Sequence, residues 1–512
     1  MRFSTSSLER LDLVYKCVGL VLLVALVFGW VLFADFFPIL FGAYADQRIL
    51  LSFLLVASTT CALVKLSSVG ALRPSLFQLW PFSVLLFSFG FGAFQYQSSN
   101  FFLVEPIFYA LYFLAFGLCG YLVWVTGCAL KVAFVVTFVA AVMCFFYAAM
   151  TVTVYAFAIF DGFSKLDEII PWGFVSIRYW SHVATWLIPI FPLFVLVGPF
   201  KRSSLWRAVS AFTATIWWWM LFMSASRGSI GGLCVSLILV LALFGKIGMS
   251  WGAVFVKYAV YGLLAWLLLS VLIPSLAFQD LHIREIRGDS SGRMALWQEA
   301  WEMSIQNFPL GMGPQSWLTH DVLTDAYRSS RKFGHPHNMY LMWAAEYGWI
   351  SILGIALLCG AALISLFHRV SRIKESISRD ACYLVAFTGS VIASLIHAGA
   401  SAVYLAPGSM LIGLIVLSVY WSLIKSDTKN EIGSSDLRPQ KKSQKLGYGV
   451  VIIFVGVSLF WFNEVLNYRR AMSSDFGSYQ QHGSFGQLPR FWLHGYFPRP
   501  PASMPITENR IQ

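Results

Sequence analysis

Charged residues are scarce in this sequence. Only 12% of its 512 residues are charged, 58% are hydrophobic, and the mean hydropathy is +0.70. A soluble domain carries about a quarter charged residues, and an interior of this size could not hide so much apolar surface from water. The composition therefore excludes a soluble enzyme, a disordered chain and a secreted disulfide scaffold. It predicts that the chain lies in a lipid bilayer.

Several chemical signatures are also missing. The eight cysteines all fall in or beside hydrophobic segments, with no C-x-x-C pair and no metal-ligand spacing, which predicts small core residues and no redox chemistry. The sequence has no Gly-rich phosphate loop with a Walker lysine, so an ATP-driven pump is not favoured. No segment predicted outside has a D-x-D pair, so a divalent-metal diphosphate site is not favoured, and we predict neither a metal nor a cofactor.

Long apolar runs fill the rest of the chain. A helix needs about 20 apolar residues to cross the hydrocarbon core, and only helices or closed barrels satisfy every backbone group there. The predicted fold is an all-α, polytopic membrane bundle of about 12–13 helices, with kinks at Pro81, Pro106, Pro189 and Pro192. The predicted spans centre on residues 12–34, 49–64, 76–96, 101–125, 132–160, 183–200, 205–224, 229–245, 253–273, 338–367, 381–397, 404–424 and 447–465.

The net charge of +12 gives the orientation. With the N-terminus in the cytoplasm, the inner side holds 21 Lys+Arg and 7 Asp+Glu, whereas the outer side holds 15 and 17. The positive-inside rule selects this orientation. The basic excess is then a topology signal, and no nucleic-acid partner is needed to explain it.

The longest internal outer segment, about 274–337, is predicted to be partly helical. Residues 293–306 place Trp297, Trp301 and Ile305 at a spacing of four, with Gln298, Glu299 and Glu302 on the opposite face. Ser290 or Ser291 is the predicted cap, and 316–329 repeats the pattern. Such a Trp-rich stripe suits a helix at the membrane interface. We expect either a cover over a site at the outer leaflet or an interfacial helix pair that merely plugs the bundle.

Three short motifs fall on this outer side: Ser226-Arg227-Gly228, Ser291-Gly292-Arg293 and Pro336-His337-Asn338. Taken singly, an arginine at this depth is as often a membrane anchor, and a histidine here more often starts a helix. Together they favour diphosphate chemistry, because two guanidinium groups bind phosphate oxygens bidentately and stabilise a leaving diphosphate. A histidine can accept a proton from an attacking hydroxyl, and a helix N-terminus favours an anion.

The segments SRG (226–228), SGRMALW (291–297), PLGMGP (309–314) and PHNMYLMWAAEYGW (336–349) occur in this order. The set resembles the O-antigen ligase and polymerase superfamily over roughly residues 205–367. Two features depart from it: Ser351 stands where ligases often have Gly, Thr or Tyr, and members commonly have about twelve spans with both ends inside.

The resemblance implies a metal-independent, inverting membrane glycosyltransferase of the GT-C type at the periplasmic face of the bacterial inner membrane. The donor would be a glycan on undecaprenyl diphosphate. The acceptor would be lipid A–core, another lipid-linked glycan or a protein hydroxyl. Arg227 and Arg293 would bind the diphosphate, and His337 would act as the base or orient the acceptor, with Asn338 beside it.

Further substrate-binding candidates come from the residues themselves. Arg178 and His182 could contact sugars, with Trp172 and Trp180 as stacking platforms or else as interfacial anchors. Glu346 is an ionisable group at membrane depth, a candidate for substrate binding or for pairing with an arginine. His397 is a weaker candidate. The competing function is a transporter or flippase of lipid-linked glycans without catalysis, although the internal repeat that such a protein often has is not visible.

The predicted organisation has five parts. They are the first six spans (1–200), three spans with the SRG motif (201–273), a periplasmic catalytic loop (274–337), the C-terminal spans (338–465) and a periplasmic tail (466–512).

Overall fold

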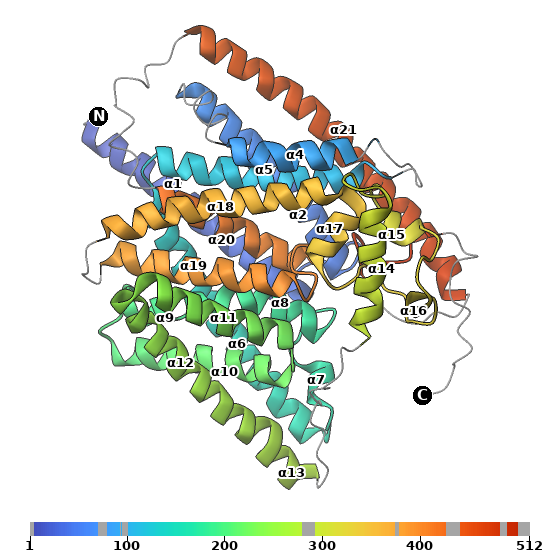
Figure 1. Cartoon of the computed structure of the whole chain (residues 1–512). Helices are drawn as coiled ribbons and strands as arrows, with labels where there is room; N and C mark the ends of the chain where they lie inside the picture. Colours follow the sequence, from blue (N-terminus) through green and yellow to red (C-terminus); the bar gives the residue numbers. More distant parts are fainter. Residues whose placement is uncertain are drawn as a thin grey trace.

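The computed structural model describes residues 5–69, 79–92, 94, 101–278, 292–373, 378–425, 441–481 and 489–499, with side chains before residue 18 and a few others left out. The described chain is helical and forms one bundle, with its long helices roughly along a common direction (Figure 1). Each of the thirteen predicted spans contains a helix in the described residues. The predicted all-α membrane bundle is confirmed.

The first half of the bundle runs from α1 to α10. Its elements are α1 (Thr5–Leu32), η1 (Ala34–Phe36), α2 (Ala43–Ser68), α4 (Trp80–Gly92), α5 (Val104–Val125), α6 (Ala129–Phe160), α7 (Leu166–Ile169), α8 (Ile177–Leu187), η2 (Ile188–Ile190), α9 (Pro192–Leu196) and α10 (Ser204–Met223).

The second half carries the site. Its elements are α11 (Arg227–Phe244), α12 (Lys246–Trp266), a π-helical turn η3 (Leu267–Leu272), α13 (Ile273–Phe278), α14 (Arg293–Gln306), α15 (Ser316–Thr319), α16 (Asp325–Arg328), α17 (Met339–Tyr347), α18 (Trp349–Arg372), α19 (Arg379–Ala398), α20 (Pro407–Lys425) and α21 (Lys441–Gln481).

Among the described residues, ten helices are long and apolar enough to cross a membrane, and two shorter apolar helices cover Val18–Leu32 and Trp80–Gly92. α8 with α9, α19 and α20 are the most buried and form the centre of the bundle. α12 with α13, α18 and α21 expose apolar side chains at the periphery, where lipid tails would contact them.

Two of the four prolines predicted to kink a helix interrupt one in the structure. Pro189 and Pro192 interrupt the sixth span, which is divided into α8, η2 and α9. Pro81 and Pro106 do not kink a helix, because each lies in the first turn of its helix. A proline is tolerated there since the first N–H groups of a helix have no partner within it.

The predicted tenth span is also divided. Gly348 has φ +79°, and it separates the short helix α17 from the long helix α18. A Cβ at Gly348 would lie 2.1 Å from the carbonyl oxygen of Pro309, so the 309–314 turn packs directly on this break. The helices α14–α17 lie together at one end of the bundle (Figure 1), which we call the site end and define by residues 292–347.

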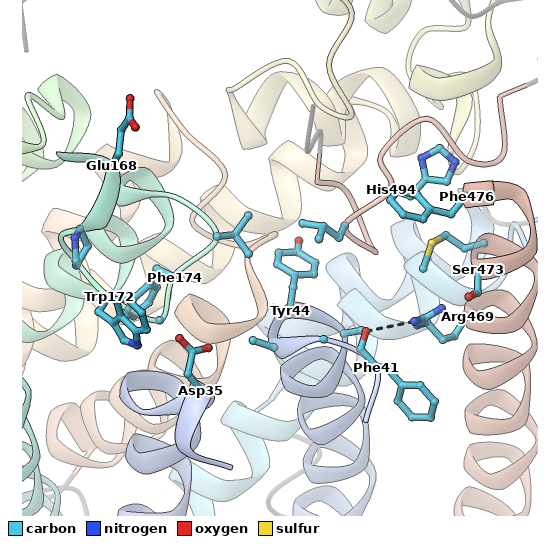
Figure 2. A pocket seen from close by; sticks show the side chains of 18 of the residues that line it. Asp35, Phe41, Tyr44, Glu168, Trp172, Phe174, Arg469, Ser473, Phe476 and His494 are labelled. Atoms are coloured by element: carbon cyan, nitrogen blue, oxygen red, sulfur yellow. Dashed lines mark hydrogen bonds between the residues drawn. The ribbon is translucent and has the colours of Figure 1, made fainter. Parts of the chain in front are cut away.

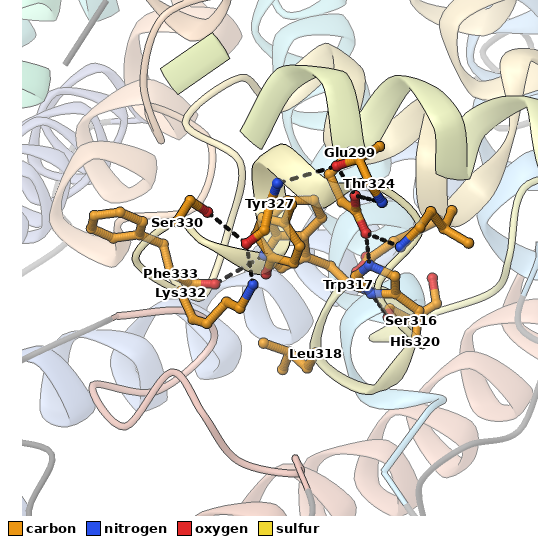
Figure 3. A network of polar contacts seen from close by, with 12 residues as sticks. Glu299, Ser316, Trp317, Leu318, His320, Thr324, Tyr327, Ser330, Lys332 and Phe333 are labelled. Atoms are coloured by element: carbon orange, nitrogen blue, oxygen red, sulfur yellow. Dashed lines mark hydrogen bonds and ion pairs between the residues drawn. The ribbon is translucent and has the colours of Figure 1, made fainter. Parts of the chain in front are cut away.

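Within the site end, α14 has the predicted limits, but residues 316–329 form two short helices rather than one. The orientation of one side chain was predicted wrongly. Glu299, expected on an exposed polar face, is fully buried, and its carboxylate accepts hydrogen bonds from His320, Leu323 and Thr324 at 2.5–2.9 Å (Figure 3). Trp301 and Ile305 remain exposed, as an interfacial stripe requires.

Candidate active site

Arg227 begins α11, at a point where three helices meet. The Ser226 hydroxyl lies 3.1 Å from that of Ser181 on α8 and 2.9 Å from that of Ser229. Gly228 faces α19, and a Cβ there would lie 2.8 Å from Cδ2 of His397. The small residues of the SRG motif therefore allow α11 to approach α8 and α19 closely, with the exposed Arg227 at the helix start.

Arg293 begins α14, directly after Gly292, which has φ +71°. The predicted caps, Ser290 and Ser291, lie outside the described residues. Burial, together with the charges of Arg178 and Arg227, lowers the pKa of Arg293. The guanidinium groups of Arg178 on α8 and Arg227 on α11 are thus both close enough to repel that of Arg293. An anion placed among them would relieve this repulsion.

His337 lies close to Arg293 and Arg178 and has an unusual backbone conformation. Its φ is +57°, and its N–H donates to Nδ1 of His335 at 3.1 Å. The imidazole packs edge-on against Phe333 and His335, with ring centroids 4.9 and 4.4 Å apart. Burial lowers its pKa to about 3, and the charges of Arg293 and Arg178 contribute to this shift. His337 is therefore neutral at physiological pH and keeps a nitrogen that can accept a proton.

The second predicted histidine, His182, is buried behind this cluster. Its Nε2 lies 2.7 Å from the Ser401 hydroxyl, and its ring is 5.0 Å from that of His397. His397 in turn contacts Thr185 at 2.9 Å through Nδ1. Either histidine could contact a sugar only after a rearrangement. In the structure both side chains instead pack in the core beneath the arginine cluster.

The structure also places three further candidates, Asn338, Trp180 and Trp172. Asn338 caps α17, because its Oδ1 accepts the N–H groups of Tyr340 and Leu341 at 3.0 and 3.1 Å. This cap occupies backbone donors that a bound anion could otherwise use. Trp180 is fully buried beside Trp217, which excludes the predicted stacking role, whereas Trp172 is 43% exposed.

Glu346 joins a buried ion network rather than the arginine cluster. Its carboxylate lies 2.7 Å from Nη2 of Arg490 and accepts the Trp317 N–H at 3.2 Å. The same Nη2 lies 2.8 Å from Glu105 on α5. This arrangement agrees with the second role considered for Glu346, pairing with an arginine.

Two residues that contribute to this region, His335 and Arg490, were not identified from the sequence. His335 stands two residues before His337, and the H-P-H spacing was the available signal. Burial lowers the pKa of His335 well below its ordinary value, with a further contribution from His337. Arg490 lies 144 residues beyond Glu346, and no local pattern marks it.

The comparisons with known proteins address this same region. Residues 211–358 match the family model described as O-antigen ligase. This segment belongs to the O-antigen ligase and polymerase superfamily. The O-antigen ligase segment contains Arg227, Arg293 and His337, whereas Arg178 and Arg490 lie outside it. No curated protein and no solved structure gives a significant match to the chain.

The O-antigen ligase match and the ten apolar helices agree on a membrane protein of polysaccharide biosynthesis. Glycosyltransferase-type ligase or polymerase activity follows from the family, as do a lipid-linked glycan and an acceptor as partners in general terms. The match favours this activity over the transporter alternative.

Proposed function

We propose that the chain transfers a glycan from an undecaprenyl-diphosphate donor to an acceptor hydroxyl at the periplasmic face of the inner membrane. The acceptor is lipid A–core in a ligase, another lipid-linked repeat unit in a polymerase, or a protein hydroxyl. The observation that carries the proposal is the gathering of Arg178 and Arg227 near Arg293, which itself lies close to His337, within and next to the matched family segment.

The proposed reaction is a single displacement. The acceptor oxygen attacks the anomeric carbon, the new C–O bond forms, and the bond between that carbon and the diphosphate oxygen breaks. The diphosphate leaves with the electron pair of this bond, and the configuration inverts. Arg227 and Arg293 hold the phosphate oxygens and stabilise the charge that develops on them, the role that a divalent metal fulfils elsewhere.

His337 accepts the proton of the attacking hydroxyl. Its lowered pKa keeps it neutral before the donor binds. A diphosphate among the arginines brings negative charge next to the imidazole, which favours the imidazolium and raises the His337 pKa in the complex. The base thus becomes stronger when the donor is present. Asn338 and Glu346 act as positioning residues, through the α17 cap and the Arg490 network.

The periplasmic location rests on the charge distribution. The site end includes the segment that the positive-inside rule assigns to the outer side. A cysteine introduced at exposed Asp325 should react with a membrane-impermeant thiol reagent in intact spheroplasts. Labelling only after lysis would place the site end in the cytoplasm.

The decisive experiment uses purified protein in detergent with lipid-linked donor and acceptor, where transport has no meaning. Arg227→Ala, Arg293→Ala and His337→Ala should each abolish transfer while the protein remains folded. Arg207→Ala is the matched control, because Arg207 is an exposed arginine in the first turn of α10. Near-normal product from all three site variants would refute the mechanism.

The three acceptor classes can be distinguished by analysing the lipopolysaccharide of a strain from which the gene is deleted. Core without any O-chain, with lipid-linked polymer accumulating, identifies a ligase. A single repeat unit on core identifies a polymerase. Unchanged lipopolysaccharide indicates another polymer or a protein acceptor.

A further inference from the structure

A hollow separate from the arginine and histidine cluster is lined by residues that all lie outside the family segment. It is a cavity of about 640 Å³ between the start of α2, the 168–175 connection and the end of α21 with residues 493–494. This volume falls within the range of small-molecule sites, roughly 300–1,000 Å³. The walls of the cavity come from segments far apart in sequence. The tail must fold back onto the bundle to supply Leu493 and His494.

Aromatic rings occupy both sides of the cavity. Figure 2 shows Trp172 and Phe174 on one side, Phe476 on the other, and Tyr44 between them. Trp172 is 43% and Phe476 is 39% exposed, so their faces are accessible. Exposed aromatic faces on opposite walls suit a flat ligand with apolar C–H surfaces, such as a pyranose ring.

Polar groups lie between the rings. Asp35 and Glu168 are among the lining residues, and the Asp35 carboxylate can accept hydrogen bonds from a ligand. The Glu168 carboxylate points away from the rings in Figure 2 and lies 3.6 Å from Nζ of Lys165. Among the described residues, two buried nitrogens in the lining have no hydrogen-bond partner, Nε of Arg469 and Nδ1 of His494. Leaving a buried polar atom unpaired is costly, and a ligand hydroxyl in the neighbouring space can satisfy it after a small side-chain rotation.

The remaining bonds of these two side chains hold them in place. Nη2 of Arg469 donates to the Phe41 carbonyl at 3.3 Å, as Figure 2 shows, and Nε2 of His494 lies 2.6 Å from the Asp475 carboxylate. Each side chain is therefore anchored through one nitrogen while another is unsatisfied. A small rotation about the anchoring contact turns the unsatisfied nitrogen toward the cavity. Such polar groups beside aromatic faces suit a ligand rich in hydroxyl groups.

The cavity is connected to the arginine and histidine cluster through aromatic contacts. The rings of Tyr44 and Tyr179 are 5.9 Å apart, and those of Tyr179 and His182 are 5.5 Å apart. Tyr179 is the neighbour of Arg178 on α8. The cavity wall is thus packed against the residues next to the site at which the diphosphate is proposed to bind.

We propose that this cavity binds a saccharide segment of the donor or the acceptor glycan. The proposal rests on the proposed function for the origin of the saccharide, although the cavity chemistry stands independently of the transfer step. The rings stack on the sugar faces, and Asp35, Arg469 and His494 bond to its hydroxyl groups. Residues outside the family segment thereby select the glycan, while residues within it handle the diphosphate.

The test is isothermal titration calorimetry with full-length protein in detergent. The probes are two delipidated saccharides released by mild acid from the lipopolysaccharide of a strain that carries this chain: the core oligosaccharide and the O-chain. The variants are Trp172→Ala and Phe476→Ala, whose side chains are partly exposed. The control is Trp80→Ala, which removes a 54% exposed tryptophan at the start of α4, outside the cavity.

We expect one saccharide to bind, with its Kd raised about tenfold or more in each cavity variant and unchanged in the control. Binding of the O-chain assigns the cavity to the donor, and binding of the core oligosaccharide assigns it to the acceptor. If neither saccharide binds, or if the cavity variants bind as the control does, the proposal is overturned. Arg227→Ala should keep saccharide binding and lose transfer. Transfer retained in Arg227→Ala would refute the proposed function and leave the cavity assignment intact.

Discussion

The guanidinium of Arg490 lies 2.7 Å from the carboxylate of Glu346, and this contact joins the tail of the chain to α17. The tail is held at several further points: Tyr44 donates to the Arg490 carbonyl at 2.7 Å, and Arg499 donates to the Leu318 carbonyl at 2.8 Å. α17 directly follows His337. The position of the proposed base therefore depends on a segment more than a hundred residues away.

Breaking this contact should destabilise the protein. Arg490→Met leaves Glu105 and Glu346 buried and close together without a counter-charge, which typically costs about 3–5 kcal/mol. We expect a lower midpoint of thermal unfolding in detergent, followed by differential scanning fluorimetry. Adding Glu105→Gln and Glu346→Gln should restore part of the loss, because the unpaired charges are then gone. The control, Arg470→Ala, removes an exposed arginine of α21. Equal midpoints for Arg490→Met and this control would contradict the role given to the network.

The sequence was informative about local features. Arg227, Arg293 and His337 were predicted together because each stands in a short polar motif beside a span or loop helix, and the alternation of spans puts all three motifs on one side. Hydropathy and helical spacing depend only on neighbouring residues. That is why the positions of the helices were predictable from the sequence.

Contacts between distant segments were not predictable in the same way. Glu299 is buried because residues 320–324 fold back over it, which the amphipathic pattern of α14 cannot indicate. Arg490 finds Glu346 only after the tail returns to the site end. A tryptophan near the end of a span is typical of an interfacial anchor. Trp180 is nevertheless covered by α10, because its ring packs against that of Trp217.

Two glycines of α11 form a matched pair for testing helix approach. A Cβ at Gly228 would lie 2.8 Å from the His397 ring and 3.2 Å from Ala400, whereas a Cβ at Gly231 has no neighbour within 4 Å. Gly228→Ala should push α11 away from α19 and displace Arg227, lowering transfer at least about tenfold and costing about 1–3 kcal/mol. Gly231→Ala should leave transfer unchanged and stabilise slightly. Similar activity in the two variants would show that the close approach is not needed.

Glu299 should control the order of the site end. Burial raises its pKa, but hydrogen bonds from His320, Thr324 and Leu323 outweigh this effect and lower the pKa overall. The carboxylate therefore stabilises the fold above its unfolded pKa of about 4.3, and this contribution is lost as the pH falls through the lower folded pKa. Glu299→Gln places an amide donor against backbone donors, so amide hydrogen exchange in residues 316–328 should accelerate at pH 7. Glu302→Gln on the same helix is the control, and equal exchange in the two variants would contradict this account.

Chelation tests the proposal that arginines replace a metal. Incubation of the purified protein with EDTA, followed by removal of the chelator and its complexes, should leave the rate of transfer unchanged. Added Mg²⁺ or Mn²⁺ should then have no effect beyond that of ionic strength, because Arg227 and Arg293 already supply the positive charge. A loss of activity that Mn²⁺ restores would refute metal independence. Zn²⁺-free buffers prevent reloading of a metal after chelation. An Arg293→Ala sample purified in the same way shows whether a contaminating transferase contributes to the rate.

The pH dependence tests His337 as the base. Because burial and the nearby arginines lower its pKa to about 3, the free protein holds it neutral throughout the physiological range. The profile of kcat/KM, which reports the free enzyme, should therefore have no acidic limb from this group near pH 6.5. The profile of kcat reports the donor complex, where the diphosphate charge raises the His337 pKa, so its acidic limb should lie at higher pH than that of kcat/KM. Arg293→Gln removes one of the charges that lower the His337 pKa. In the residual activity of this variant, the acidic limb of the kcat/KM profile should therefore move to higher pH. Coinciding limbs near pH 6.5 in both profiles would mean that the arginines do not act on the base.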